Sequence, residues 1–167
     1  MGEYGWVGAT RFAGGPNSSR NKEADQAFLP GSRSFSNGDY PTFVIEVGVS
    51  ESLSVLRADA AFWLLNIGGG CRLVSIAAVN RCIAFALYQR GLVPGHTTRN
   101  NPHPPDRLEA VLVTPQIVVQ QAGELEPPSI SIPLQVLFDV VLPGLTGDDV
   151  VLTSHLRRIA SRIWRFS

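Results

Sequence analysis

Apolar residues gather in short runs along the chain, and turn-forming residues separate these runs. The densest run, TFVIEVGV at residues 42–49, is rich in β-branched and aromatic residues and predicts a central strand. Residues 50–66 carry apolar positions at helical spacing, which predicts a helix that Ser50 or Ser52 caps. The runs RLVSIAAV and CIAFALY follow and predict two further strands.

The other segments are expected to complete a single domain, since 167 residues fit one domain of ordinary size. Residues 1–24 are rich in Gly, Asn, Ser and Arg, and they predict an extended segment with little core potential. Residues 25–135 form the predicted core domain, with a Pro/Asn-rich surface loop at 94–106. Residues 136–167 are expected to be a helical extension packed on that core. The predicted fold class is α/β (α+β), a mixed central sheet flanked by helices.

Composition narrows the classes of function. The 14 basic and 14 acidic residues cancel, so composition gives no sign of a strongly electropositive nucleic-acid-binding surface, although a local patch stays open. Lys22 is the only lysine. Cys71 and Cys82 are expected at opposite ends of paired strands, which predicts free thiols and an intracellular protein. No apolar run reaches the length of a membrane span, so no membrane partner is expected.

Glu46 stands in the middle of the predicted central strand. Side chains alternate between the two faces of a strand, so Val44, Glu46 and Gly48 share one face. A carboxylate among apolar neighbours is costly to bury unless a cation, a metal or hydrogen-bond donors compensate it. Gly48 is expected to leave space on this face for an ion and a phosphate. The alternative is a structural carboxylate bonded to backbone donors or to Arg57.

Asp25, in the preceding short strand, is the best candidate for a second carboxylate near Glu46. Two oxygen ligands on adjacent strand ends suit Mg²⁺ or Mn²⁺, which keep several waters and take phosphate oxygens as further ligands. Such a metal acidifies an attacking water and neutralises charge on the transferring phosphate. The alternative for Asp25 is an exposed acid at the end of a strand.

Several segments resemble a fungal group of proteins in the PD-(D/E)XK nuclease, or restriction-endonuclease-like, superfamily. They are KEADQAF, PTFVIEVGVSESLSVLRADAAFWL, CRLVSIAAV, IPLQVLFD and DVVLTSHLRRIASRIW. The strand-to-helix segment at 41–64 is the most specific of them. The resemblance implies a mixed sheet flanked by helices, and Mg²⁺-dependent hydrolysis of phosphodiester bonds in nucleic acid.

The resemblance also implies roles for particular residues. Asp25 matches the acid of the first motif strand, Glu46 matches the acid of the E-x-K element, and the Val47 carbonyl would be a further metal ligand. Gly48 occupies the lysine position. Some members of the superfamily carry the cation on the following helix, where Arg57 is available. Arginine is a poor proton acceptor, so Arg57 would orient and stabilise rather than act as a base.

Two alternatives belong to other classes of function. The first is a catalytically inactive nuclease-like fold that serves as a binding or scaffold domain, which Gly48 and the zero net charge favour. The second is a serine hydrolase, because Ser50 lies between a predicted strand and helix as in a nucleophile elbow. Asp148 or Asp149 and then His155 follow in the required chain order. The missing final glycine of the elbow and the lack of preceding parallel βαβ units disfavour this second alternative.

Overall fold

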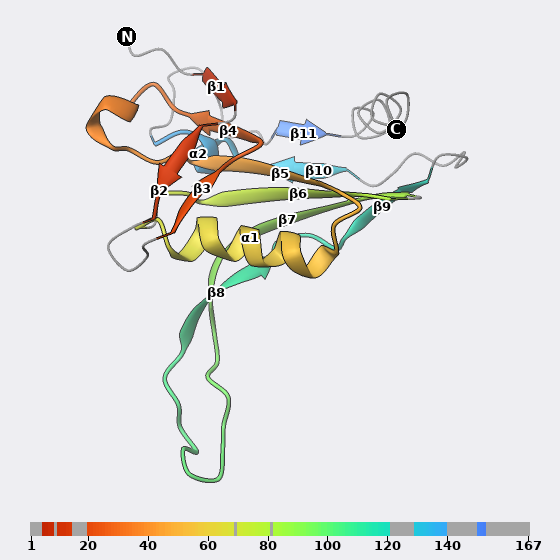
Figure 1. Ribbon diagram of the computed structural model, residues 1–167. Coiled ribbons are helices and arrows are strands. Elements are labelled where there is room, and N and C mark those ends of the chain that lie inside the picture. The colour runs from red at the N-terminus through yellow and green to blue at the C-terminus, as the bar shows by residue number, and fades with distance from the viewer. Residues whose placement is uncertain are drawn as a thin grey trace.

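The computed structural model shows a mixed α+β fold built on one central sheet (Figure 1). The structure describes residues 5–8, 10–14, 20–68, 70–80, 82–120, 129–139 and 150–152. The strands are β1 (Gly5–Gly8), β2 (Arg11–Ala13), β3 (Asn21–Glu23), β4 (Gln26–Leu29), β5 (Phe43–Val49), β6 (Leu73–Val79), β7 (Cys82–Val93), β8 (Arg107–Leu112), β9 (Ile117–Gln120), β10 (Ile130–Ile132) and β11 (Val150–Leu152). The helices are α1 (Leu53–Leu65), α2 (Leu134–Leu137) and a 3-10 turn at Phe35–Asn37.

The central sheet has seven strands in the order β1-β4-β5-β6-β7-β8, with β9 also paired to β7. β5 and β6 run parallel because α1 connects them as a crossover, while the other neighbouring pairs are antiparallel. The predicted central strand is therefore confirmed as β5, between β4 and β6. The prediction of a mixed sheet is also confirmed.

Apolar side chains cover both faces of this sheet. On one face, Val44 of β5 packs in a cluster with Leu56 and Trp63 of α1. On the other face, Phe43 of β5 lies in a second apolar cluster together with Ile130 of β10. Residues of α2 pack against this second cluster. The alternation along β5 thus places Glu46, like Val44, on the α1 face.

The start of α1 fixes the geometry just after Glu46. Ser52 is the cap, because its hydroxyl accepts a hydrogen bond from the Val55 N–H at 3.4 Å. Ser50 instead takes the left-handed conformation, with φ at 66°, and its N–H donates to the Val79 carbonyl. The helix ends at Leu65 with Asn66 as its C-cap, and Gly68 follows with φ at 65°, a conformation that favours glycine.

The N-terminal segment contributes more to the fold than its composition predicts. β1 joins the central sheet by pairing with β4, and β2 pairs with β3 as a separate two-stranded sheet. Phe12 of β2 is buried, and its ring lies 5.5 Å from the Trp63 ring. The expectation of little core potential in residues 1–24 is wrong at Phe12, because a distant helix supplies its apolar neighbours.

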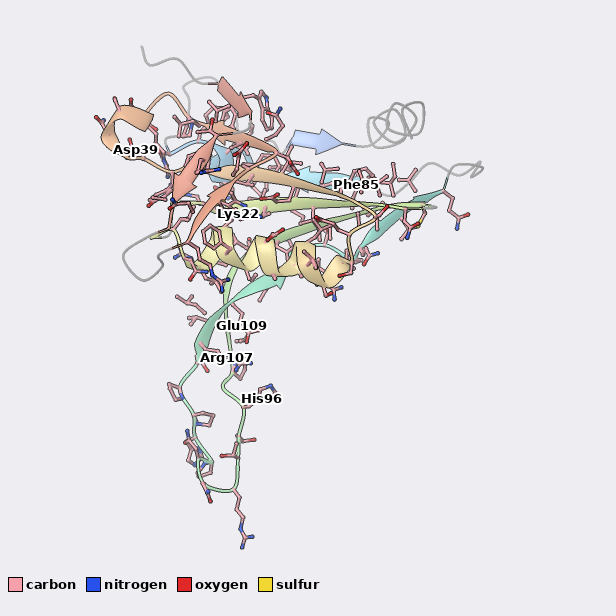
Figure 2. All side chains as sticks on the ribbon, in the orientation of Figure 1. Lys22, Asp39, Phe85, His96, Arg107 and Glu109 are labelled. Carbon is pink, nitrogen blue, oxygen red and sulfur yellow. The ribbon has the colours of Figure 1, made fainter. Side chains whose placement is uncertain are left out.

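A long arm projects from the body of the molecule, formed by β7, β8 and the loop between them (Figures 1 and 2). The two strands stay paired out to Val93 and Arg107, and a β-bridge between Thr98 and Asn101 lies in the loop beyond. The surface loop at 94–106 was expected, but its support on an extended two-stranded arm was not.

Most of the predicted helical extension at 136–167 lies outside the described residues, together with Asp148, Asp149 and His155. In its described part, residues 150–152 form the strand β11, so the expectation of a helical extension is wrong there, because these residues pair with β10. Cys71 and Cys82 are free thiols, as predicted. Within the described ranges, α1 and α2 are too short to cross a membrane.

Candidate functional site

Glu46 is a buried carboxylate on the central strand β5. The residue is only 5% exposed, on the face that α1 covers. The indole Nε1–H of Trp63 donates a hydrogen bond to Glu46 Oε1. Trp63 is fully buried. Its indole N–H has a second role, because it holds one oxygen of this carboxylate in place.

The only lysine of the chain reaches this carboxylate. Lys22 lies on β3 opposite Phe12, so the side of the hairpin that packs on Trp63 also presents the ammonium (Figure 2). Lys22 Nζ is 2.9 Å from Asp59 Oδ1 and 3.5 Å from Glu46 Oε1. Lys22 therefore joins two acids, one on α1 and one on β5.

The charge state of Glu46 reflects these surroundings. Burial raises its pKa from 4.5 to about 7, against the opposing effects of the Trp63 hydrogen bond and the Lys22 charge. The nearby negative charges of Asp25 and Asp59 also raise this pKa. A carboxylate that titrates near neutral pH in a polar cluster is a recurrent property of functional sites.

Asp25 lies beside Glu46, just before β4 begins. The β4–β5 register pairs Gln26 with Ile45, so Asp25 is level with Glu46 on the neighbouring strand. Asp25 Oδ2 accepts a hydrogen bond from the Val47 N–H at 2.7 Å. The N–H and C=O of a strand residue point to the same edge, which places the Val47 carbonyl on the β4 side as well. The structure thus brings together Asp25, Glu46 and Val47.

The space expected at Gly48 is filled, so that expectation is wrong. A Cβ added to Gly48 would lie 2.9 Å from both Cβ and Oε2 of Glu51 and 3.0 Å from Leu56 Cδ1. The Glu51 side chain therefore folds back over β5. Gly48 permits this close approach and does not open a pocket.

Arg57 lies elsewhere on the helix. Its Nε–H donates to the Tyr88 hydroxyl at 3.0 Å, on the β7 side of α1. Asp59 lies two residues further on, about 200° around the helix axis, and faces Lys22 instead. Among the described residues, the cation in contact with Glu46 is Lys22, and no contact joins Arg57 to Glu46. Sequence reasoning missed Lys22 and Asp59 as site residues, although the uniqueness of Lys22 was visible.

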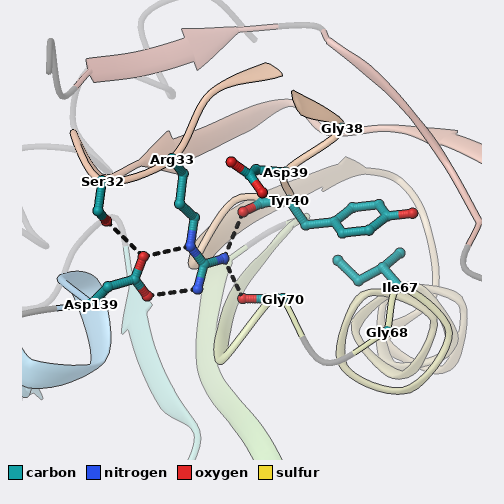
Figure 3. Close-up of a pocket in the computed structure, with 9 residues that line it drawn as sticks. All are labelled: Ser32, Arg33, Gly38, Asp39, Tyr40, Ile67, Gly68, Gly70 and Asp139. Carbon is teal, nitrogen blue, oxygen red and sulfur yellow. Dashed lines mark hydrogen bonds and ion pairs between the residues drawn. The ribbon is translucent and has the colours of Figure 1, made fainter. Parts of the chain in front are cut away.

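A second charged cluster lies near the C-terminal end of α1 (Figure 3). Asp139 accepts two hydrogen bonds from Arg33 and one from Ser32, each at 2.7 Å, and pairs with Arg72 at 2.6 Å. These donors lower the pKa of Asp139 from 3.8 to about 2. The cluster borders a pocket of about 540 Å³, where Arg33 also donates to two backbone carbonyls. The charged groups here satisfy one another.

The candidate site is therefore a two-carboxylate site with one lysine. Within the described ranges, no group of three or more His, Cys, Asp or Glu side chains is arranged to hold a metal ion. Asp25 and Glu46 each use one oxygen for a protein donor, while Asp25 Oδ1 and Glu46 Oε2 accept no hydrogen bond from the described residues. No protein-family model, curated protein or solved structure matches the chain.

Proposed function

We propose that this chain is a metal-dependent phosphodiesterase of the PD-(D/E)XK type that acts on nucleic acid. The observation that carries the proposal is one group of side chains. Asp25, just before β4, is level with Glu46 of the paired strand β5, and the only lysine of the chain contacts Glu46. The resembling segments predict this acid pair, and Lys22 supplies the cation that the Gly48 position lacks.

The arrangement of strands supports the finer fold assignment in this proposal. β4 and β5 form an antiparallel pair, with Asp25 just before β4 and Glu46 on β5, and α1 then crosses over to β6, parallel to β5. A mixed sheet with the acids on adjacent strands and a helix after the second acid is what a restriction-endonuclease-like fold requires. We propose that fold on this basis.

The donor set fits Mg²⁺ or Mn²⁺. These ions prefer oxygen ligands, and Mg²⁺ keeps several waters, so one or two carboxylates are sufficient protein ligands. Asp25 Oδ1 and Glu46 Oε2 would hold the ion, with the Val47 carbonyl as a third ligand. When bound there, the ion would acidify an attacking water and neutralise charge on the phosphate.

The other side chains of the site have supporting roles in this proposal. The Trp63 ring packs against Phe12, which fixes its position. Its indole N–H therefore holds the Glu46 carboxylate in one orientation. Lys22 supplies a positive charge beside the carboxylate pair, where an ammonium orients water and stabilises the charge of a phosphate. Its three donors rotate on a flexible stem, so it can serve both the carboxylate and a phosphate oxygen.

A cleavage assay tests the proposal on single- and double-stranded DNA and RNA, with Mg²⁺, with Mn²⁺ and with EDTA. Wild type is compared with Glu46→Ala and Asp25→Asn, and Asp106→Asn on the exposed arm serves as a control purified in the same way. We expect metal-dependent cleavage by wild type and the control, and a loss of at least about 100-fold in both site variants. Cleavage that survives in Glu46→Ala would count against the proposal.

A second candidate function is an inactive nuclease-like fold that binds or scaffolds. The observation that favours it is that Trp63 and Lys22 both contact Glu46 Oε1, so groups of the protein itself already compensate part of this charge. The same assay separates the two candidates. A folded wild type that cleaves none of the substrates, yet still shifts one of them in a metal-free gel, would favour the scaffold.

A further inference from the structure

The Lys22 ammonium forms ion pairs with two carboxylates. It lies 2.9 Å from Asp59 Oδ1 and 3.5 Å from Glu46 Oε1, so its closer partner is the acid on α1. The carboxylate of Asp59 is more exposed than that of Glu46, with side-chain exposures of 28% and 6%. Lys22 can therefore leave Glu46 and remain paired.

Glu46 is also the acid that a divalent cation needs in the proposed function. An ammonium and a doubly charged ion on one carboxylate repel each other, by an amount equivalent to roughly tenfold in affinity or more at such distances. The backbone of β3 is anchored by Phe12 on Trp63, whereas the Lys22 side chain has a flexible four-carbon stem. The change that relieves the repulsion is consequently a movement of the ammonium and not of the hairpin.

We propose that Lys22 competes internally with a divalent cation for Glu46, and that Asp59 is a positioning residue that receives the Lys22 ammonium when the cation is bound. This inference rests on the metal site of the proposed function. In the metal-free protein, Lys22 compensates the negative charge of Glu46 in the place of the cation. In the metal-bound protein Lys22 stays next to the site, held by Asp59, in reach of a phosphate.

The proposal predicts opposite effects of one substitution on binding and on cleavage. Lys22→Met removes the competing charge, so we expect Mg²⁺ and Mn²⁺ to bind about tenfold more tightly in a calorimetric titration. The same variant should cleave more slowly, because no ammonium remains beside the phosphate. A purely structural lysine would not move these two quantities in opposite directions.

A second measurement uses wild type and does not depend on cleavage. Because Lys22 is the only lysine, ¹³Cε-lysine labelling gives a single lysine side-chain signal. Glu46→Gln removes the charge on that carboxylate and leaves the ammonium on Asp59, which provides a reference position for the signal. We expect saturating Mg²⁺ to move the wild-type signal toward that reference.

Asp59 has its own test. Asp59→Asn should weaken Mg²⁺ binding several-fold, because the displaced ammonium loses its second carboxylate. Asp59→Glu should restore binding and the Mg²⁺-dependent movement of the Lys22 signal. Asp106→Asn removes an acid on the arm and is the control for the loss of one negative charge.

The outcomes separate this inference from the proposed function. Metal binding at Glu46 with no tightening in a folded Lys22→Met variant would overturn the competition and leave the metal site standing. Metal binding in wild type with an unmoved Lys22 signal would do the same. Absence of metal binding in wild type and in Lys22→Met would overturn both the competition and the proposed metal-dependent activity.

Discussion

Glu46 and Asp139 are two carboxylates that meet cationic side chains in one molecule, and their pKa values move in opposite directions. Asp139 receives charged donors from Arg33 and Arg72, and its pKa falls to about 2. Glu46 receives a neutral indole N–H and a lysine at 3.5 Å, and burial raises its pKa to about 7. At Asp139 the direct hydrogen bonds from charged donors outweigh the desolvation of the carboxylate. At Glu46 the neutral indole and the more distant lysine do not.

The difference indicates which acid is available for chemistry. Asp139 is bonded to Ser32 and Arg33, which follow β4, and to Arg72, which precedes β6. These partners are far from Asp139 in the sequence, so its ion pairs explain it as a structural clamp. One oxygen of Glu46 accepts no hydrogen bond from the residues that the structure describes, and a second acid, Asp25, is level with it. A pocket lies beside Asp139, yet the incompletely compensated acid lies at the other cluster.

The largest expected effect comes from removing the charge of Glu46. Below about pH 4.5 this carboxyl is protonated in both states, and between about 4.5 and about 7 it ionises first in the unfolded chain. Wild type therefore loses stability as the pH rises through that window, and Glu46→Gln does not. We expect the variant to exceed wild type by about 3 kcal/mol at pH 8 in urea unfolding, with no difference at pH 4. A difference that stays constant with pH would contradict the assigned burial cost.

Asp139 should show the opposite sign and a smaller effect. Its folded pKa is below the unfolded value of 3.8, so its stabilisation is present above that pH and is lost as the pH falls toward about 2. We expect Asp139→Asn to lose about 2 kcal/mol at pH 7 and to match wild type at about pH 2. Asp106→Asn on the exposed arm is the control and should stay within about 0.5 kcal/mol of wild type. If the two variants behave alike at pH 7, Asp139 is no clamp.

Each cluster also has a glycine in a tight place. A Cβ at Gly70 would lie 2.5 Å from Tyr40 Cβ, whereas a Cβ at Gly48 would meet Glu51 Cβ and Oε2 less closely, at 2.9 Å, and only the Oε2 contact can be relieved by rotating the side chain. We expect Gly70→Ala to cost about 2 kcal/mol and Gly48→Ala about 1 kcal/mol, by overpacking. Thermal unfolding at fixed pH ranks them, and the reverse order would show that the Glu46 cluster is the more rigid of the two.

The smallest effect is expected at Arg57. Its hydrogen bond to the Tyr88 hydroxyl is partly exposed, so Arg57→Gln should cost about 0.5 kcal/mol in urea unfolding. Metal affinity and cleavage should remain those of wild type, because Lys22 is the cation at Glu46. A large loss of cleavage with unchanged stability would show that Arg57 takes part in the reaction.

The elements around Glu46 could be predicted because their signals are local. β5 is a dense β-branched run, α1 has a serine cap and a glycine stop, and Asp25 and Glu46 follow from two adjacent strands. The β2–β3 hairpin has no such signal. Its strands are three residues each and mostly polar, and its position depends on the packing of Phe12 against Trp63. Tertiary contacts of this kind are invisible to periodicity.

The cation of the site was missed for the same reason. Lys22 reaches Glu46 only because the hairpin folds over the sheet, and sequence spacing alone does not show which strand lies over which. Arg57 was the reasonable choice from position along the helix, but its direction around the helix axis takes it to Tyr88. Asp59 and Trp63 are four residues apart and share a face, which would have pointed to the side of α1 that meets Glu46.

The projecting β7–β8 arm has a practical consequence for handling this protein. None of residues 93–107 belongs to either apolar cluster, and Arg99 lies exposed in the loop between the paired strands. Of the basic residues that the structure describes, we expect trypsin to cut at this one first, since exposed loop tips are preferred sites of nicking. The two fragments would stay associated through the strand pairs of β8 and β9 with β7. The same loop is the natural place to graft a tag or to open the chain for circular permutation.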